Sequence, residues 1–402
     1  MPTPSDSSNH AASVSWPRDD AKLERVRALM AEEDVDALVV RAPDNVLYLS
    51  NFLPMKGYDL VVFPREGEQT LICLEPSADD AARMAWTQDV RLFPGYDARD
   101  ARPPQARALD VAVDVCRARG LDRIGLELSQ GTQTADRMVG EPTTPTLALF
   151  EGFPNRVDAS PLLAQTRMLK TPQEIERMRL ANELAALAMD EMRTQLRSPE
   201  SMREAQVAGM WEHTVHSVGT GYKGKVENAR GYSLIWSGPG IRTFTATSDR
   251  PIVEHQPTLF EIWVSADGYW CDHTKNLVVG ELEPRYAKLE EQLIEIYDRA
   301  VEHCTDGASL PELDCLIRNG IAEAGYLGQP SHPVAHGVGA RAHEPPYAHQ
   351  AGSGTIRKGM VLAIEPGIYW DEGGGLRVED NWLVTDGAPE KLCSFPDGIV
   401  RV

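Results

Sequence analysis

The stretch TLFEIWVSADGYWCDHTKNLVVG, residues 258–280, decides the fold. Two runs rich in apolar residues flank a turn at 266–268, which predicts two antiparallel strands joined as a hairpin. Glu261 and Asp272 lie eleven residues apart, one on each expected strand, so their carboxylates can converge on one face. A buried carboxylate is costly unless it is paired or holds a cation, so the hairpin indicates a chemical site.

Three more acidic or imidazole groups stand in apolar, strand-like segments further along the chain. They are His336 in PVAHGVG (333–339), Glu365 in LAIEPG (362–367) and Glu379 in LRVED (376–380). Taken singly, an acidic strand residue usually faces solvent, and a lone histidine is more often a hydrogen-bonded core residue. Together, four carboxylates and one imidazole suit Mn²⁺, Fe²⁺, Co²⁺ or Zn²⁺ more than copper or an iron–sulfur cluster. One or two such ions can activate water, which indicates hydrolysis.

Composition bounds the class of protein and its partners. A chain of 402 residues with 42% hydrophobic and 25% charged residues is typical of a globular protein with two domains. The net charge of −20 disfavours nucleic acid and anionic membranes as partners. No apolar run reaches the roughly 20 residues that span a bilayer. The polar N-terminus resembles no targeting signal, and six scattered cysteines indicate no disulfide framework, so we expect a reducing cytoplasm.

The pattern of elements changes at about residue 160. Before it, helix-like and strand-like segments alternate, such as an amphipathic run at 23–35 and β-branched runs at 36–40 and 59–63, which predicts α/β layers. After it, Thr171 and Glu174 form a capping box with Pro172 at the first helical position, so a helix should start there. The later segments combine helices with a largely antiparallel sheet, an α+β arrangement.

Several short motifs of the sequence resemble those of the creatinase, prolidase and methionine aminopeptidase family, whose fold is called pita-bread. The matching motifs are AHGVG, AHEPP, AIEPGIY, RVED, the NVLYLSNF segment at 45–52, and the residues Lys170, Glu174, Ile175, Met178 and Arg179. The resemblance implies a pita-bread catalytic domain over 165–402, preceded by a smaller α/β creatinase-type domain over 18–158. It also implies a homodimer in which the small domain leans over the neighbour's active site.

The resemblance also implies roles for the site residues. The five metal ligands of the family's peptidases fall on Glu261, Asp272, His336, Glu365 and Glu379. Asp272 and Glu379 would bridge two metal ions, and Glu365 would carry the proton of the activated water. His343, seven residues after His336, matches a histidine that steadies the tetrahedral intermediate, and Arg377 matches an arginine that orients Glu379.

Two departures from the family pattern leave the substrate open. Glu261 stands where the peptidases carry aspartate, and Thr245 stands where Xaa-Pro peptidases carry a histidine. The leading interpretation is a metal-dependent hydrolase of an amide-type C–N bond in a dipeptide or another small molecule. One alternative is a non-peptidic hydrolase or lyase, similar to creatinase or the dimethylsulfoniopropionate lyases. Another is a pita-bread binding module without catalysis.

Overall fold

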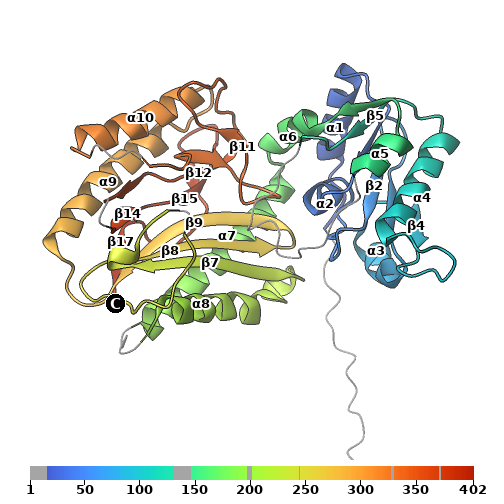
Figure 1. Ribbon diagram of the computed structural model, residues 1–402. Helices are drawn as coiled ribbons and strands as arrows, with labels where there is room; N and C mark the ends of the chain where they lie inside the picture. The colour runs from blue at the N-terminus through green and yellow to red at the C-terminus, as the bar shows by residue number, and fades with distance from the viewer. Residues whose placement is uncertain (1–15, 130–145, 197–201, 244, 327–329, 371–372) are drawn as a thin grey trace, which may run out of the picture.

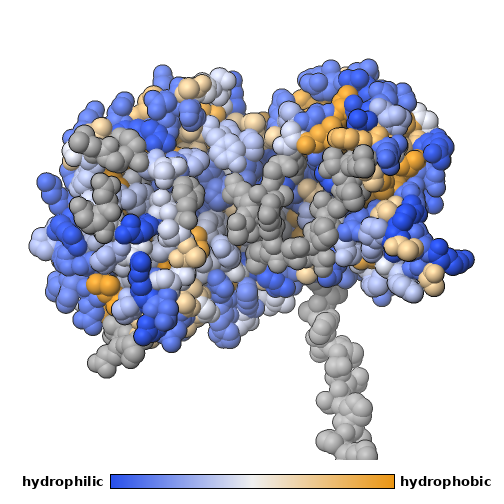
Figure 2. Space-filling model, viewed as in Figure 1, coloured by the Kyte–Doolittle hydropathy of each residue, from blue (hydrophilic) through white to orange (hydrophobic). Residues whose placement is uncertain are grey.

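The computed structural model describes residues 16–129, 146–196, 202–243, 245–326, 330–370 and 373–402. Two domains lie side by side and are joined by helix α6 (Ser160–Met168), as Figure 1 shows. The face seen in Figure 2 is largely hydrophilic, with hydrophobic residues gathered on the upper part of the N-terminal domain. Within the described ranges, no helix has both the length and the apolar character needed to cross a membrane.

A six-stranded sheet with the order β4-β3-β2-β1-β5-β6 forms the centre of the N-terminal domain. Its strands are β1 (Ala37–Val40), β2 (Leu60–Pro64), β3 (Thr70–Leu74), β4 (Val90–Phe93), β5 (Ile124–Leu126) and β6 (Arg156–Asp158). Successive strand residues point to opposite faces, so Leu38 and Val61 join one apolar cluster while Val39 and Val62 join another. The predicted α/β layering is confirmed.

Five helices cover the two faces and the ends of this sheet. They are α1 (Asp20–Glu32), α2 (Pro43–Ser50), α3 (Ala78–Met84), which follows the 3₁₀ turn η1 (Glu75–Ser77), α4 (Pro104–Ala118) and α5 (Thr146–Gly152). The Asp19 side chain caps α1 by accepting a hydrogen bond from the Lys22 amide, so this helix starts three residues before the amphipathic run at 23–35. Helix α2 contains the 45–50 part of the NVLYLSNF segment, which places that segment against the second domain.

The capping box predicted at the start of the C-terminal domain is present. The Thr171 side chain accepts a hydrogen bond from the Glu174 amide, and the Glu174 carboxylate accepts one from the Thr171 amide. Pro172 occupies the first turn, where its missing N–H costs nothing. Helix α7 (Pro172–Gln195) therefore begins where the sequence predicts.

Three sheets make up the β part of the C-terminal domain. The four-stranded sheet, with the order β17-β9-β8-β7, contains β7 (Ala229–Ser237), β8 (Thr258–Ala266), β9 (Tyr269–Val278) and β17 (Ile399–Arg401). The five-stranded sheet, with the order β11-β10-β12-β15-β16, contains β10 (Ala335–Gly337), β11 (Glu344–Tyr347), β12 (Val361–Ile364), β15 (Asp380–Leu383) and β16 (Glu390–Lys391). The third sheet is the pair β13 (Gly367–Tyr369) and β14 (Gly375–Arg377).

Helices enclose these sheets from two sides (Figure 1). Helices α7 and α8 (Glu204–Gly219) share an apolar core with the four-stranded sheet, in which Leu184, Trp211 and Phe260 are fully buried. Helices α9 (Pro284–His303) and α10 (Leu310–Glu323) share a second core with the five-stranded sheet. The short 3₁₀ turns η3 (Tyr222–Gly224) and η4 (Gly238–Gly240) lie in the connections around β7. The predicted α+β architecture is confirmed.

Two strand-like segments, 361–370 and 376–386, are each divided into two strands in the structure. The segment 361–370 forms β12 and β13, separated at Glu365 and Pro366, because proline has no N–H to continue a ladder. The segment 376–386 forms β14 and β15, and an isolated bridge between Glu379 and Thr274 joins the two large sheets at that break. Both interruptions therefore fall where the candidate site residues lie.

The β8–β9 hairpin also forms part of the contact between the domains. Its turn residue Gly268 has a φ of +80°, and a Cβ there would lie 2.3 Å from Leu47 Cδ2 of helix α2. Glycine is thus required both by the backbone conformation and by the close approach of the two domains. Beside the turn, the buried Lys22 ammonium of α1 lies 3.3 Å from the Tyr269 hydroxyl. The hairpin that contains Glu261 and Asp272 is held against the N-terminal domain at its tip.

Candidate metal centre

The structure brings the five sequence-predicted ligand residues together in one buried place. Three overlapping groups have ligand atoms within 4.8 Å of one another, and each member of the five belongs to at least one group. The groups are Glu261, Asp272 and Glu379; His336, Glu365 and Glu379; and Asp272, His336 and His343. They come from β8, β9, β10 and the breaks after β12 and β14. None of the five predicted ligands is more than 7% exposed.

Strand register explains why the hairpin carboxylates share one face. Glu261 pairs with Thr274 and Trp263 pairs with Asp272 across the antiparallel β8–β9 ladder. Directly opposite residues point to the same side of a sheet, and so do residues two apart. Glu261, Asp272 and Thr274 therefore project toward the centre, while the residues between them point to the other face.

His336 presents a ring nitrogen suited to metal ligation. Its Nδ1 lies 3.0 Å from the Gly337 carbonyl oxygen, so Nδ1 donates its hydrogen and Nε2 keeps its lone pair. Among the described residues Nε2 has no hydrogen-bond partner, and it lies 3.6 Å from Asp272 Oδ2 and 3.4 Å from Glu365 Oε1. A buried imidazole lone pair beside two carboxylates is a donor set that suits a divalent ion, so these residues fit such an ion.

Charge also favours a cation at this centre. The buried carboxylates of Glu261, Asp272, Glu365 and Glu379 bring four negative charges, and the buried guanidinium of Arg377 brings one positive charge. Burial raises the pKa of Glu379, and the Glu365 charge raises it further, because the ionised form lacks compensation. One or two divalent ions would supply that compensation.

Arg377 reaches Glu379 through Thr274 and also by a longer, direct ion pair. Its Nη2 contacts Glu261 Oε2, and its Nε donates a hydrogen bond of 2.6 Å to Thr274 Oγ1. Thr274 Oγ1 donates in turn to Glu379 Oε2 at 2.8 Å, whereas Arg377 Nε and Glu379 Oε2 lie 3.8 Å apart. The contact with Arg377 therefore engages one oxygen of the Glu261 carboxylate. Glu261 is the residue that stands where the resembling peptidases carry aspartate.

His343 lies beside His336 at the edge of the centre. Their rings are stacked with centroids 4.4 Å apart, and His343 Nε2 lies 3.4 Å from Asp272 Oδ2. Burial and the neighbouring His336 lower the pKa of His343 to about 3, so its imidazole is neutral at physiological pH. A neutral imidazole can donate one hydrogen bond to a substrate oxygen without releasing a proton.

His332 belongs to the site, although sequence reasoning missed it. Its Nδ1 lies 3.1 Å from Glu365 Oε2, and its Nε2 lies 3.1 Å from the Tyr369 hydroxyl. Burial works to raise the pKa of Glu365, but the charge and hydrogen bond of His332 outweigh it and the net shift is downward. The signal available in the sequence was its spacing of four residues from His336 in HPVAHGVG.

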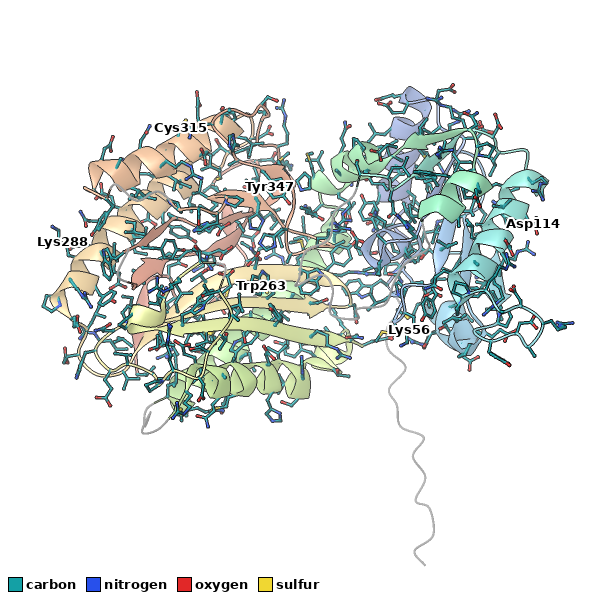
Figure 3. All side chains as sticks on the ribbon, viewed as in Figure 1. Lys56, Asp114, Trp263, Lys288, Cys315 and Tyr347 are labelled. Carbon is teal, nitrogen blue, oxygen red and sulfur yellow. The ribbon has the colours of Figure 1, made fainter. Side chains whose placement is uncertain are left out.

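Aromatic side chains lie close to the histidines of the centre. Trp263 on β8 lies 6.3 Å from the His343 ring and 5.3 Å from the Tyr232 ring, measured between centroids. Tyr347, which is 41% exposed, lies on the part of the C-terminal domain next to the N-terminal domain (Figure 3). The other departure, Thr245, is exposed in the segment after η4.

A second buried group, His273, Asp380 and Cys393, lies on the opposite face of the same strands. Lys275 Nζ lies 2.5 Å and Lys391 Nζ 3.0 Å from Asp380 Oδ2, so two ammonium groups already compensate this carboxylate. A metal ion would be repelled by both ammonium groups. We interpret this group as an ion-pair network that supports β9 and β15 from behind.

Comparison with known proteins places this site in a family context. The model described as metallopeptidase family M24 matches residues 176–386, and the creatinase/prolidase N-terminal domain model matches residues 22–169. The Xaa-Pro dipeptidase of Pyrococcus furiosus is 26% identical over 378 residues, which cover 92% of this chain and 97% of that protein.

Solved structures show the same fold over nearly the whole chain. The Xaa-Pro dipeptidase from Bacillus anthracis has a TM-score of 0.78 at 22% identity and covers 95% of this chain and 99% of its own. The prolidase from Pyrococcus horikoshii OT3 has a TM-score of 0.74 at 24% identity and covers 94% and 99% respectively. The expected pita-bread domain with its creatinase-type partner is therefore confirmed.

Proposed function

The chain belongs to metallopeptidase family M24, and from that membership we propose that it hydrolyses Xaa-Pro dipeptides at the bond before proline. The family makes it a divalent-metal-dependent hydrolase. The observation that carries the proposal is the convergence of four buried carboxylates and His336 in overlapping groups of three, whose ligand atoms lie within 4.8 Å of one another in each group. The similarity to Xaa-Pro dipeptidases along 92% of the chain supports the substrate class.

Each site residue has a distinct part in the proposed reaction. A bound divalent ion would lower the pKa of water and polarise the scissile carbonyl. Glu365 accepts the proton of the attacking water and passes it to the leaving proline nitrogen, while His332 keeps that carboxylate in place. The neutral His343 donates a hydrogen bond to the oxygen that becomes negative. Arg377 and Thr274 hold the Glu261 and Glu379 carboxylates in position.

The test is a substrate panel on metal-loaded protein. Purified full-length enzyme is stripped with chelator, reloaded with Mn²⁺, Co²⁺, Fe²⁺ or Zn²⁺, and assayed for proline release from Ala-Pro, Gly-Pro and Met-Pro. Ala-Ala is the matched control without proline. We expect proline release that requires an ion and exceeds Ala-Ala hydrolysis at least tenfold. No turnover of any Xaa-Pro peptide by protein with a full ion complement would reject the dipeptidase proposal.

A second candidate is a non-peptidic hydrolase or lyase. Two observations favour it, namely the engagement of Glu261 by Arg377 and the absence of an imidazole at Thr245. The same loaded enzyme is therefore offered betaines, amidino compounds and dimethylsulfoniopropionate. The Thr245→His variant separates the candidates, because gained Xaa-Pro activity in this variant would indicate that the wild-type pocket is shaped for another substrate.

Three further properties belong to this proposal. We propose Mn²⁺ as the working ion, since an oxygen-rich set with one imidazole suits it. We propose a homodimer, which light scattering coupled to size exclusion tests directly. We propose a reducing compartment, consistent with the free and mostly buried thiols of the described cysteines.

A further inference from the structure

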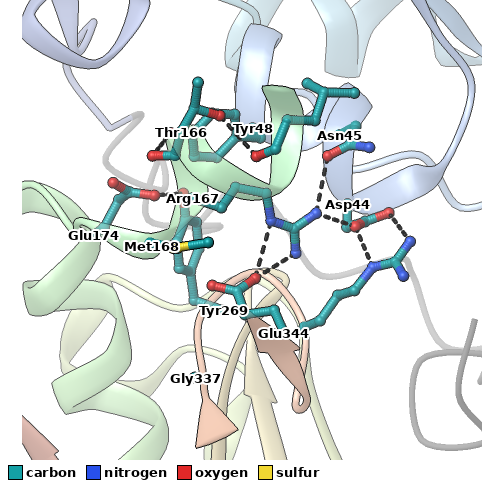
Figure 4. A network of polar contacts seen from close by, with 12 residues as sticks. Asp44, Asn45, Tyr48, Thr166, Arg167, Met168, Glu174, Tyr269, Gly337 and Glu344 are labelled. Carbon is teal, nitrogen blue, oxygen red and sulfur yellow. Dashed lines mark hydrogen bonds and ion pairs between the residues drawn. The ribbon is translucent and has the colours of Figure 1, made fainter. Parts of the chain in front are cut away.

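A buried carboxylate next to His343 is held by two cations, one on helix α6 and one in the connection between α6 and α7. Glu344 is 2% exposed, and its Oε2 accepts hydrogen bonds from Arg167 Nε at 2.9 Å and Nη2 at 2.6 Å. Its Oε1 accepts a third bond from Lys170 Nζ at 2.8 Å. Figure 4 shows the arginine fork on Glu344. Both oxygens are thus fixed by charge-assisted bonds, which fixes the start of β11.

The same arginine reaches into the N-terminal domain. Arg167 Nη1 donates a hydrogen bond of 2.9 Å to Asn45 Oδ1 and contacts Asp44, both on α2 (Figure 4). Arg341, two residues before His343, forms an ion pair with the same Asp44. The segment around His343 is therefore attached at both sides to one helix of the neighbouring domain.

A glycine leaves the space that this arrangement needs. A Cβ on Gly339 would lie 2.3 Å from Glu344 Oε1 and 2.9 Å from Lys170 Cε. The Gly339 carbonyl accepts a hydrogen bond of 2.8 Å from the Trp270 amide, on the hairpin that contains Asp272. The turn between β10 and β11 is thereby fixed between the Glu344 cluster and the candidate metal centre.

Apart from the 3.4 Å approach of its Nε2 to Asp272 Oδ2 and the neighbouring Trp263 ring, the His343 side chain has few contacts that fix it, so we expect it to depend on this support. Among the described residues its Nδ1 has no hydrogen-bond partner, and its ring rests on the His336 ring. We propose that Arg167 and Lys170 act as positioning residues, setting the His343 imidazole through Glu344. Docking of the N-terminal domain then becomes a condition for an ordered active site. The step from ordering to turnover rests on the hydrolase function proposed above.

The experiment compares three variants of the full-length, metal-loaded protein. Glu344→Gln removes the charge at constant shape, Arg167→Met removes the fork, and Arg167→Lys keeps the charge but cannot make both bonds to Oε2. The matched control is Arg179→Met, which removes another bidentate arginine–glutamate pair, with Glu390, outside the candidate metal groups. Steady-state kinetics, ion affinity by calorimetry and melting temperature are measured for each.

We expect Glu344→Gln and Arg167→Met to lower kcat by about 10- to 100-fold with KM and ion affinity within about twofold of wild type. Arg167→Lys should recover part of that loss, and Arg179→Met should change neither kinetic constant. A merely structural role would instead lower ion affinity and melting temperature together, with no separation of kcat from KM, and that result would overturn the proposal.

A readout without turnover separates this inference from the proposed function. The ten histidines give side-chain resonances in ¹⁵N-labelled protein, and the His343→Ala spectrum assigns His343. We expect the His343 resonance to move in Glu344→Gln and Arg167→Met and to stay in Arg179→Met, whichever substrate the enzyme takes. If the His343 resonance does not move in either variant, the inference is wrong even if proline release is observed. If Glu344→Gln does not fold, the same comparison is made with Arg167→Lys.

Discussion

Thr274 Oγ1 donates a hydrogen bond of 2.8 Å to Glu379 Oε2, across the only bridge between β9 and the break before β15 found in the described residues. The same oxygen accepts a bond of 2.6 Å from Arg377 Nε. The Thr274 hydroxyl on β9 thus connects the four-stranded sheet with the Glu379 carboxylate, which lies just before β15 of the five-stranded sheet. Outer groups of this kind orient metal ligands and tune their affinity.

Replacing Thr274 with valine should weaken ion binding without unfolding the protein. Valine keeps the shape but removes the donor to Glu379 and the acceptor for Arg377, so the ligand loses its fixed orientation. We expect Mn²⁺ affinity to fall about 10- to 100-fold. Calorimetric titration of chelator-stripped protein measures it. Thr214→Val, on α8, is the control and should bind the ion as wild type does; equal affinities for the two variants would contradict the relay.

Shortening Glu261 to aspartate should raise the number of tightly bound ions. The longer side chain contacts Arg377, and removal of one methylene withdraws the carboxylate toward β8 and away from the guanidinium. We expect one tightly held ion per wild-type chain and two in Glu261→Asp, counted by elemental analysis after dialysis. Glu212→Asp, outside the cluster, should leave the count at one. Two ions in the wild type would show that Arg377 does not hinder the first site.

Asp59 should make the free energy of unfolding of the protein fall as the pH rises from about 4 to about 7. Burial raises the pKa of Asp59 from 3.8 to about 7, opposed by a hydrogen bond from the Leu74 amide. Because the folded protein binds the Asp59 proton more tightly than the unfolded chain does, protonation of Asp59 favours the folded state. This contribution is complete below the unfolded pKa and is lost as the pH rises through the folded pKa of about 7.

The Asp59→Asn variant, which keeps the acceptor for Leu74, lacks this loss. We expect it to exceed wild type in free energy of unfolding at pH 8 by up to roughly 4 kcal/mol, and to match it near pH 4. Urea titrations at several pH values measure the difference. Asp114→Asn, at an exposed position of α4, should show no such trend. If the unfolding free energies of wild type and Asp59→Asn change with pH in parallel, the pKa of Asp59 in the folded protein is not raised.

Adding a methyl group to Gly268 should loosen the contact between the domains. The residue combines a positive φ with a Cβ position 2.3 Å from Leu47 Cδ2. We expect Gly268→Ala to cost about 2–4 kcal/mol, measured by urea unfolding. Gly307→Ala shares a positive φ but meets nothing within 4 Å, so it should cost only about 1 kcal/mol. A similar loss of unfolding free energy in the two variants would show that the Leu47 side chain moves aside without a measurable energetic cost.

The sequence allowed the local features of the site to be predicted. Alternation with a period of two places Glu261 and Asp272 on one hairpin face, and the capping box fixes the start of α7. These features depend on residues close together along the chain. The convergence of the five ligand positions was predicted only with the help of the family resemblance, because spacing within one strand does not reveal which strand lies opposite.

Contacts between distant segments were beyond prediction. Arg377 lies beside Glu379, which it was expected to orient, but its contact with Glu261 and its hydrogen bond to Thr274 were not anticipated. His332 and the arginine fork on Glu344 were not anticipated, since each depends on packing between elements that sequence patterns do not place. A charged residue in an apolar segment shows that a partner exists, but the choice among many distant partners follows from the tertiary fold.

The arginine of α6 has a practical consequence for recombination between relatives. Because Arg167 contacts Asp44 and Asn45 on one side and Glu344 on the other, a crossover placed before α6 would pair it with a foreign α2. A crossover placed after α6 would pair it with a foreign β11. Chimeric enzymes built from this chain should therefore take α2, α6 and the β10–β11 turn from the same parent, although these segments belong to two domains.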